Sequence, residues 1–254
     1  MPNPTESEKI QAVKSALQES NYTVFFGGAG VSTASGIPDF RSAIGLYNQK
    51  HASAYTPEEM LSRSFYLRHP REFFSYHFGN LIARKAQPNR AHLALAKLEA
   101  AGKLQALITQ NIDGLHQAAG SENVIELHGN TYRFYCEKCQ RAYTLDEAEA
   151  SAGVHQGVPL CAVCQGRVRP DVVLYEEQLD PAILQAATWA ARKAEMLIVG
   201  GTSLLVYPAA GLVDLFRGRT LVIINHMPTP YDYQATHLLR GDIDAILWEI
   251  AREE

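Results

Sequence analysis

The sequence predicts an α/β fold in which helices cover both faces of a parallel sheet and a smaller domain is inserted. Two observations support this prediction. Short apolar strands alternate with helical patterns along most of the chain, and two segments of different composition interrupt the alternation. A chain of 254 residues is long enough to bury a substantial core in such a fold.

The predicted elements follow the apolar pattern from the N-terminus onward. Thr5 and Glu8 form a capping-box pattern before a helix near residues 6–19, and an apolar strand follows at 22–26. The later strands and helices alternate in the same way. The strands are expected at 104–108, 124–127, 196–199 and 221–224, and the helices near 89–101, 181–193, 208–217 and 242–252.

Two segments break this alternation. Residues 42–86 are polar and aromatic with helical character, and residues 132–169 contain every cysteine of the chain. We expect the two segments to assemble into one small domain beside the sheet. The predicted division is a sheet domain of residues 1–41, 87–131 and 170–254, and a small domain of residues 42–86 and 132–169.

The four cysteines form two C-x-x-C pairs with the spacing C-x2-C-x21-C-x2-C. Four thiolates in this pattern are typical of a closed tetrahedral zinc site, which holds structure and leaves no open position for water. The alternative is a set of reduced or redox-active cysteines. We predict one structural zinc ion held by Cys136, Cys139, Cys161 and Cys164.

A glycine-rich loop follows the first strand. Gly28 and Gly30 allow a backbone to approach a pyrophosphate closely, with its N–H groups turned toward the anion. Thr33 stands where the dinucleotide fingerprint has its third glycine, and the loop continues to Phe40 and Arg41. We therefore predict a nucleotide-binding loop that does more than hold a cofactor.

Polar residues or glycines follow each of the later predicted strands. Each is also typical of an ordinary turn, or of a histidine satisfied by local hydrogen bonds. Because ligands of a parallel sheet bind at the carboxyl ends of its strands, their recurrence favours one nucleotide site. The residues are Gln110, Asn111, Ile112 and Asp113 after 104–108, His128 after 124–127, Gly201 and Ser203 after 196–199, and Asn225 after 221–224.

Composition and charge favour a cytoplasmic protein. The net charge of −4 gives no basic footprint for nucleic acid or for an anionic membrane. No apolar run approaches the roughly 20 residues that span a bilayer. The N-terminal residues have no cationic and apolar pattern typical of a secretory signal. We expect a cytoplasmic location, with neither nucleic acid nor membrane as a direct partner.

Taken together, these motifs resemble those of the sirtuin family, the NAD-dependent protein deacylases, in their bacterial form. The resemblance covers roughly residues 20–245 and implies a Rossmann-like domain and a small domain that combines a helical module with a zinc ribbon. The motifs occur in the family's order. They are the run from Gly28 to Arg41, then Gln110 to Asp113, His128-Gly129, the four cysteines, Gly201-Thr202-Ser203 and Asn225.

The resemblance implies a role for each matching residue, with NAD as co-substrate. The catalytic residues would be His128, Asn111 and Asp113. The residues that bind NAD would be Gly28, Ala29, Gly30, Thr33, Phe40 and Arg41 in the pocket, Gln110, Ile112 and Asp113 at the ribose and nicotinamide, and Gly201, Ser203, Asn225 and Asp242 at the adenosine half.

The implied reaction removes an acyl group from a lysine side chain. The acyl oxygen attacks the nicotinamide ribose and expels nicotinamide, and lysine and O-acyl-ADP-ribose are the products. His128 would act as general base on the ribose hydroxyls. A histidine suits this role because its unperturbed pKa lies near neutrality.

The implied partner is an acyl-lysine peptide or protein, bound as an added strand beside Val173, Tyr175 and Val206. This chain has Tyr175-Glu176-Glu177 where the family has Phe-Gly-Glu, so Glu176 lacks the backbone freedom of glycine. Its carboxylate is hypothesised to favour basic residues beside the target lysine. The Tyr-x-x-Arg pair of members that remove succinyl or malonyl groups is missing around 73–80, which favours neutral acyl groups.

Three alternative functions share some of these features. An NAD-dependent protein ADP-ribosyltransferase would release nicotinamide but transfer ADP-ribose to a protein. A non-enzymatic zinc-ribbon binding protein would leave Asn111, Asp113 and His128 unexplained, and an oxidoreductase would be expected to keep the third glycine of the loop. The sequence leaves the physiological substrate, the acyl chain length and the oligomeric state open, and it is compatible with a monomer.

Overall fold

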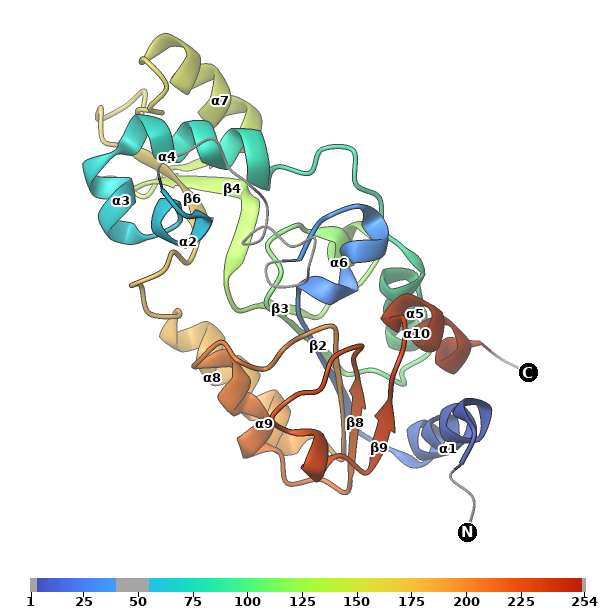
Figure 1. Ribbon diagram of the computed structural model, residues 1–254. Helices are drawn as coiled ribbons and strands as arrows, with labels where there is room; N and C mark the ends of the chain where they lie inside the picture. The colour runs from blue at the N-terminus through green and yellow to red at the C-terminus, as the bar shows by residue number, and fades with distance from the viewer. Residues whose placement is uncertain (1–3, 40–54, 253–254) are drawn as a thin grey trace.

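The computed structural model describes residues 4–39 and 55–252 and contains two sheets of different kinds (Figure 1). The larger sheet has six strands in the order β3-β2-β1-β7-β8-β9, and all of its pairings are parallel. The predicted α/β fold is therefore confirmed. Its strands are β1 (Thr23–Gly27), β2 (Ala106–Thr109), β3 (Val124–Glu126), β7 (Met196–Gly200), β8 (Thr220–Ile224) and β9 (His237–Leu239).

Helices cover both faces of this sheet. Along β1, Phe25 packs into one apolar core, whereas its neighbours Val24 and Phe26 pack into the other. This explains why the strands are apolar throughout and do not alternate with polar residues. The first core lies under α1 (Glu6–Glu19), α5 (Arg90–Ala100) and α10 (Ile243–Ala251), and the second under α8 (Pro181–Lys193) and α9 (Leu212–Leu215) (Figure 1).

The helix ends follow their capping signals. Thr5 accepts a hydrogen bond from the backbone of Glu8, and Glu8 bonds back to Thr5, so the predicted capping box of α1 is confirmed. Asn89 caps α5 in a similar way. None of the helices within residues 4–39 and 55–252 combines the length and the apolar character that a membrane crossing requires.

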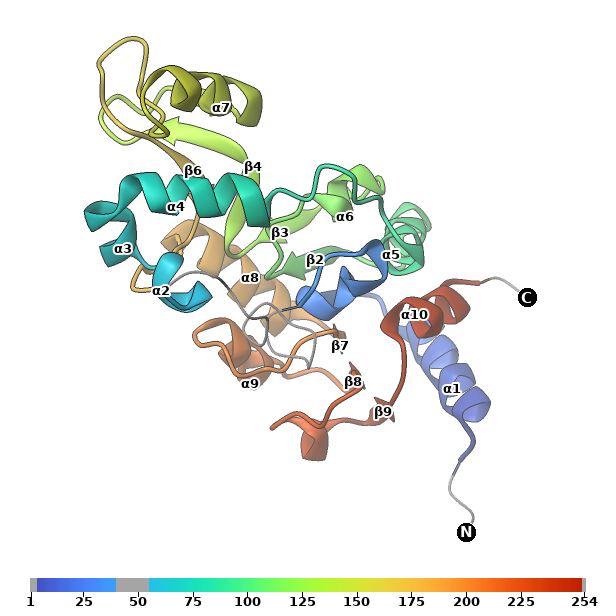
Figure 2. The ribbon, with the colours of Figure 1, turned by 45° about the horizontal axis from the view of Figure 1, so that its top comes forward.

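A smaller antiparallel sheet and several helices form the second part of the fold, which lies to one end of the large sheet in both views (Figures 1 and 2). Its third apolar core includes Phe73, Phe74 and Phe134. The strands, in the order β5-β4-β6, are β4 (Gly129–Cys136), β5 (Ala142–Thr144) and β6 (Val168–Val172), and the helices are α2 (Pro57–Met60), α3 (Arg63–Arg68), α4 (Pro70–Tyr76) and α7 (Leu145–Val154).

The small sheet is continuous with the chain around the predicted site. β4 begins directly after His128, and β6 ends directly before Val173. The domain limits predicted after residue 131 and before residue 170 fall inside β4 and β6, and the division into domains stays a prediction. The chain thus enters and leaves the small domain beside the candidate catalytic histidine.

One predicted helix is shorter in the structure. The expected helix near 208–217 is divided into a 3-10 turn at Ala209–Gly211 and the single-turn helix α9. Gly211 is a weak helix former, so this run does not continue as one α-helix.

Candidate active site

The loops that follow neighbouring strands are hydrogen-bonded to one another at the carboxyl edge of the large sheet. The N–H of Gly28 donates to the carbonyl of Gly200 at 3.2 Å, and the N–H of Gly30 donates to the carbonyl of Gly201 at 2.8 Å. Gln110 donates its backbone N–H to the last residue of β1 at 3.0 Å. The predicted residues after β1, β2 and β7 therefore lie together.

Glycine is needed here because two backbones come into contact. A β-carbon on Gly30 would lie 2.8 Å from the Cα of Gly201, and one on Gly201 would lie 2.6 Å from the nitrogen of Val31. Gly201 also has a φ of +60°, in the left-handed region. The glycines thus serve the packing of the two loops, in addition to the approach to phosphate that their sequence predicts.

The loop after β1 continues as two short 3-10 turns, Ala29–Val31 and Thr33–Ser35. Thr33 begins the second turn, and its hydroxyl donates to the carbonyl of Gly30 at 2.9 Å. This bond shapes the loop locally at the position where the common fingerprint has a glycine. Phe40 and Arg41 lie outside the described residues, so their part in NAD binding stays a prediction.

The buried side chain of Ser32 joins two of the predicted catalytic residues. Its hydroxyl donates to Asp113 Oδ2 at 2.6 Å and accepts from Asn111 Nδ2 at 3.0 Å. The other carboxylate oxygen of Asp113 accepts the N–H of Leu115 at 2.9 Å. These bonds fix the orientation of both side chains. Ser32 belongs to the loop motif, but the motif did not identify it as a site residue.

His92, which the sequence did not indicate, approaches Ser32 from α5. Its Nδ1 accepts the N–H of Asn89 at 3.2 Å, so the ring proton lies on Nε2, which is 3.5 Å from Ser32 Oγ. Burial lowers the pKa of His92 to about 4, and the nearby Asp113 carboxylate opposes this shift. His92 is therefore neutral at neutral pH. The local signal, a capping box, could not reveal a partner so distant in sequence.

His128 lies immediately before β4 with a defined tautomer. Its Nδ1 is 2.9 Å from the carbonyl oxygen of Gln110. A carbonyl can only accept, so Nδ1 carries the proton and Nε2 keeps its lone pair. Burial lowers the pKa of His128, and the hydrogen bond to Gln110 partly offsets this. The neutral ring is thus prepared to accept a proton at Nε2.

Of the predicted peptide-binding residues, Val173 contacts His128 directly. The N–H of Val173 donates to the carbonyl of His128 at 3.0 Å, and Tyr175 follows two residues later with a partly exposed side chain. Val206 lies in the loop after β7, where its carbonyl accepts the N–H of Ala210 at 2.8 Å. The structure thus ties the first of the two predicted segments to the candidate catalytic histidine.

The residues predicted for the adenosine half lie on loops at the same edge. Asn225 follows β8 and donates its N–H to the carbonyl of Leu239 at 3.2 Å. Asp242 precedes α10 and accepts a 2.7 Å hydrogen bond from His226 Nε2. Ser203 is half-buried in the loop after β7. Ile112, predicted for the ribose and nicotinamide, accepts at its carbonyl the N–H of Thr131 in β4 at 2.9 Å.

The four cysteines meet at the end of the small sheet. Their sulfur atoms all lie within 4.8 Å of one another, and this donor set fits a closed four-coordinate zinc site. The Tyr143 hydroxyl donates to Cys161 Sγ at 3.1 Å and accepts the N–H of Ala162 at 3.1 Å. Such an outer contact orients a ligand sulfur, and the sequence did not indicate it.

Comparison with known proteins identifies the family. The model of the Sir2 family matches residues 28–208. The chain belongs to the Sir2 family. It is 52% identical over 244 residues to an NAD-dependent protein deacetylase of Clostridium perfringens, covering 96% of this chain and 98% of the relative. A deacetylase of Staphylococcus aureus (strain N315) is 40% identical over 244 residues, with the same coverage of both chains.

Solved structures of Sir2 proteins are also similar. A complex with a p53 peptide and NAD⁺ aligns with a TM-score of 0.84 and 40% identity, covering 94% of this chain and 95% of that one. A complex with a deacetylated p53 peptide and 3′-O-acetyl-ADP-ribose has a TM-score of 0.86 and 39% identity, covering 95% and 96%. The resemblance inferred from the motifs is therefore confirmed.

Proposed function

We propose that the protein is an NAD-dependent protein lysine deacylase that prefers neutral acyl groups and yields nicotinamide and O-acyl-ADP-ribose. The observation that supports this function most directly is the arrangement around His128. The Nε2 lone pair is available in a neutral ring, and the backbone of the same residue binds Val173 in the segment expected to contact the peptide. Sir2 structures with acetylated and with propionylated peptides agree with a neutral acyl group.

Different residues of this chain would have different roles in the reaction. Bound NAD supplies an electrophilic ribose carbon when nicotinamide leaves. Gln110, Ile112 and Asp113 would hold the ribose and nicotinamide. Ser32 fixes the side chains of Asp113 and of the catalytic candidate Asn111. His128 would accept a proton from a ribose hydroxyl at Nε2. The glycine loop and the loop after β7 would hold the phosphates through backbone N–H groups.

Zinc has a structural part in this proposal. Four cysteine ligands complete the coordination of the ion, so the zinc site would stabilise the small domain and take no part in the reaction. The substrates would be proteins with an acylated lysine. The cytoplasmic location and the absence of nucleic acid and membrane partners remain predictions of the sequence.

The decisive experiment follows nicotinamide release from NAD in the presence of an acetyl-lysine peptide. We expect release to depend on the peptide and to match the amount of deacetylated product. Replacing the catalytic base (His128→Ala) should lower product formation at least ~100-fold, the lower end of what general base catalysis contributes. Circular dichroism of this variant should show that the fold is kept.

Two comparisons test the remaining parts of the proposal. Malonyl and succinyl peptides should be turned over more slowly than the acetyl peptide, and faster turnover would reject the preference for neutral acyl groups. Mass spectrometry of the products should find O-acetyl-ADP-ribose. Covalent attachment of ADP-ribose to protein, without deacetylation, would instead establish the ADP-ribosyltransferase.

A further inference from the structure

Glu176 occupies a backbone conformation that is typical of glycine. Its φ is +74°, in the left-handed region that a β-carbon disfavours. This is the residue that stands in place of the glycine of the family pattern. A non-glycine residue keeps such a conformation only when its surroundings hold it there. The surroundings of Glu176 therefore indicate what it does.

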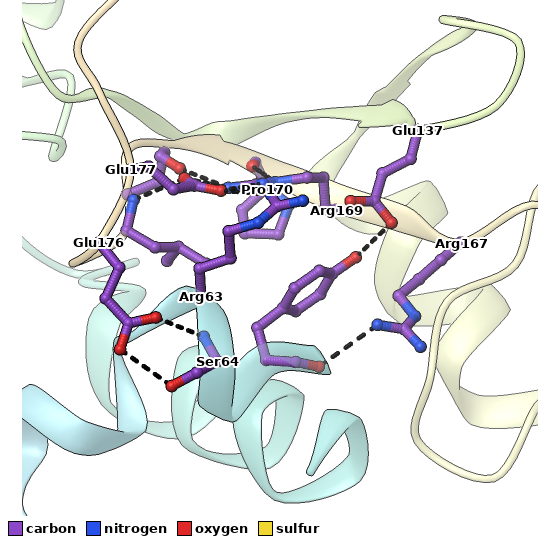
Figure 3. Close-up of polar contacts among 11 residues, drawn as sticks. Arg63, Ser64, Glu137, Arg167, Arg169, Pro170, Glu176 and Glu177 are labelled. Atoms are coloured by element: carbon purple, nitrogen blue, oxygen red, sulfur yellow. Dashed lines mark hydrogen bonds and ion pairs between the residues drawn. The ribbon is translucent and has the colours of Figure 1, made fainter. Parts of the chain in front are cut away.

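The carboxylate of Glu176 binds the first turn of α3 through Ser64. The Ser64 N–H donates to Glu176 Oε2 at 2.9 Å, and the Ser64 hydroxyl donates to Oε1 at 2.9 Å (Figure 3). Each carboxylate oxygen thus has a donor from the same residue. We name this pair of bonds the Glu176–Ser64 clamp. It joins the predicted peptide-binding segment to the helical part of the small domain.

The backbone beside the clamp is paired with the same helical part. Tyr175 donates its N–H to the carbonyl of Leu61 at 3.0 Å, and its carbonyl accepts the N–H of Arg63 at 3.0 Å. Residues 61–63 and Tyr175 therefore form a short parallel bridge. One edge of the segment is occupied by this pairing, which fixes the direction in which the rest of the segment faces.

Glu177, the residue after Glu176, anchors residues 172–177 to β6 and to α3. Its two carboxylate oxygens accept hydrogen bonds from the buried Arg169 at 2.6 and 2.9 Å, and Arg63 and the N–H of Leu174 also donate to it (Figure 3). Glu177 is thus tied to β6 and to α3. The paired arginines lower the pKa of Glu177 against the effect of its burial, which keeps it ionised.

We propose that Glu176 is a positioning residue for the acyl-lysine peptide. The Glu176–Ser64 clamp holds residues 172–177 in the conformation that presents Val173 and Tyr175 to the peptide. This inference rests on the proposed function. The sequence suggested that the Glu176 carboxylate attracts basic residues of the substrate. In the structure both carboxylate oxygens bind Ser64, so the carboxylate instead stabilises the conformation of residues 172–177.

The test compares single and double variants of the clamp. Ser64→Ala and Glu176→Ala should each raise the KM for an acetyl peptide about threefold to tenfold, the range expected for a charge-assisted helix cap. The KM for NAD and kcat should change less than twofold. The double variant should be no worse than Glu176→Ala, because Ser64→Ala removes only the hydroxyl bond of the clamp, which Glu176→Ala already removes.

Two further substitutions and a control separate shape from charge. Glu176→Gln keeps an acceptor oxygen for Ser64 and should rescue much of the KM, and Glu176→Gly should lie between wild type and Glu176→Ala because glycine tolerates the positive φ. Ser15→Ala, in α1, is the matched control and should leave every parameter unchanged; Ser15 bonds only within its own helix turn among the described contacts.

Amide hydrogen exchange of residues 172–177, measured without peptide, tests the clamp independently of activity. Exchange should be faster in Ser64→Ala than in wild type and in Ser15→Ala. Unchanged exchange, additive effects of the two alanine variants, or equal changes in the KM for NAD would overturn the inference. So would a loss of preference for basic peptides in Glu176→Gln but not in Ser64→Ala, which would establish charge recognition.

Failure of the proposed function and failure of the positioning role of Glu176 give different experimental results. If the wild-type protein releases no nicotinamide in response to any acyl peptide, both the function and the peptide role are rejected. The exchange measurement would still report whether the clamp exists. If release is normal and the clamp variants retain the wild-type KM for peptide, only the positioning role is rejected.

Discussion

At the scale of single residues, His128 combines burial with one fixed proton. The carbonyl of Gln110 holds the proton on Nδ1, and burial lowers the pKa of the ring below its ordinary value of 6.5. A base with a lowered pKa stays neutral in more acidic solution. We therefore expect the acidic limb of the kcat/KM profile for formation of the deacetylated product to have its midpoint below pH 6.5. A midpoint at or above pH 6.5 would contradict this assignment.

The same measurement needs a stability control, because three other histidines are buried. Burial lowers the pKa of His77 to about 3, of His92 to about 4 and of His116 to about 3. The unfolded chain then binds more protons than the folded one below pH 6.5, so stability falls as the pH decreases through that value. Circular dichroism over the same range distinguishes loss of the fold from protonation of His128.

At the scale of elements, the contact between the loops after β1 and β7 determines the shape of the candidate NAD site. Gly201→Ala would introduce a β-carbon 2.6 Å from the nitrogen of Val31 and would strain a φ of +60°. We expect a loss of roughly 2–3 kcal/mol in unfolding free energy and weaker NAD binding. Urea unfolding and calorimetric titration with NAD measure the two effects.

Gly102 provides a matched control for this substitution. Its φ is +67°, but nothing lies within 4 Å of the position of an added β-carbon. Gly102→Ala therefore introduces the backbone strain but not the steric clash. We expect it to lower the unfolding free energy by about 1 kcal/mol and to leave NAD binding unchanged. Equal losses for the two variants would mean that the loop contact contributes nothing.

The elements that the sequence predicted well are those with strong local signals. The apolar strands 196–199 and 221–224 became β7 and β8, and the capping box at Thr5 marked the start of α1. The small sheet was not predicted because β4 has neither a continuous apolar run nor a regular alternation of buried residues. A signal for α7 was present in the capping box of Thr144, which has the same form as that of Thr5.

The candidate site was likewise predicted only in part from the sequence. Motif residues such as Asn111 and Asp113 were identifiable because they follow a strand, and the structure places them together. The contacts of Ser32 with His92 and of Glu176 with Ser64 join positions 60 and 112 residues apart. No local pattern encodes such pairs, since they form only when elements that are distant in the sequence pack against each other.

At the scale of the whole molecule, the small sheet connects Cys136, one of the four cysteines, with the predicted peptide-binding segment. β4 begins directly after His128 and ends at Cys136, and β6, its antiparallel partner, leads directly into Val173. We therefore expect a change at the cysteines to affect the candidate site through these two strands. The large parallel sheet packs against its own two apolar cores, which contain no residue of β4, β5 or β6.

Removal of zinc should consequently affect the two parts of the molecule differently. Chelation, or Cys136→Ser, should destabilise the small sheet by several kcal/mol, because a structural zinc site contributes directly to folding. We expect amide exchange to accelerate in β4, β5 and β6 and peptide binding to be lost, while the exchange of β1, β7 and β8 stays slow and NAD still binds. Simultaneous loss of protection in both sheets would show instead that the molecule unfolds as one cooperative unit.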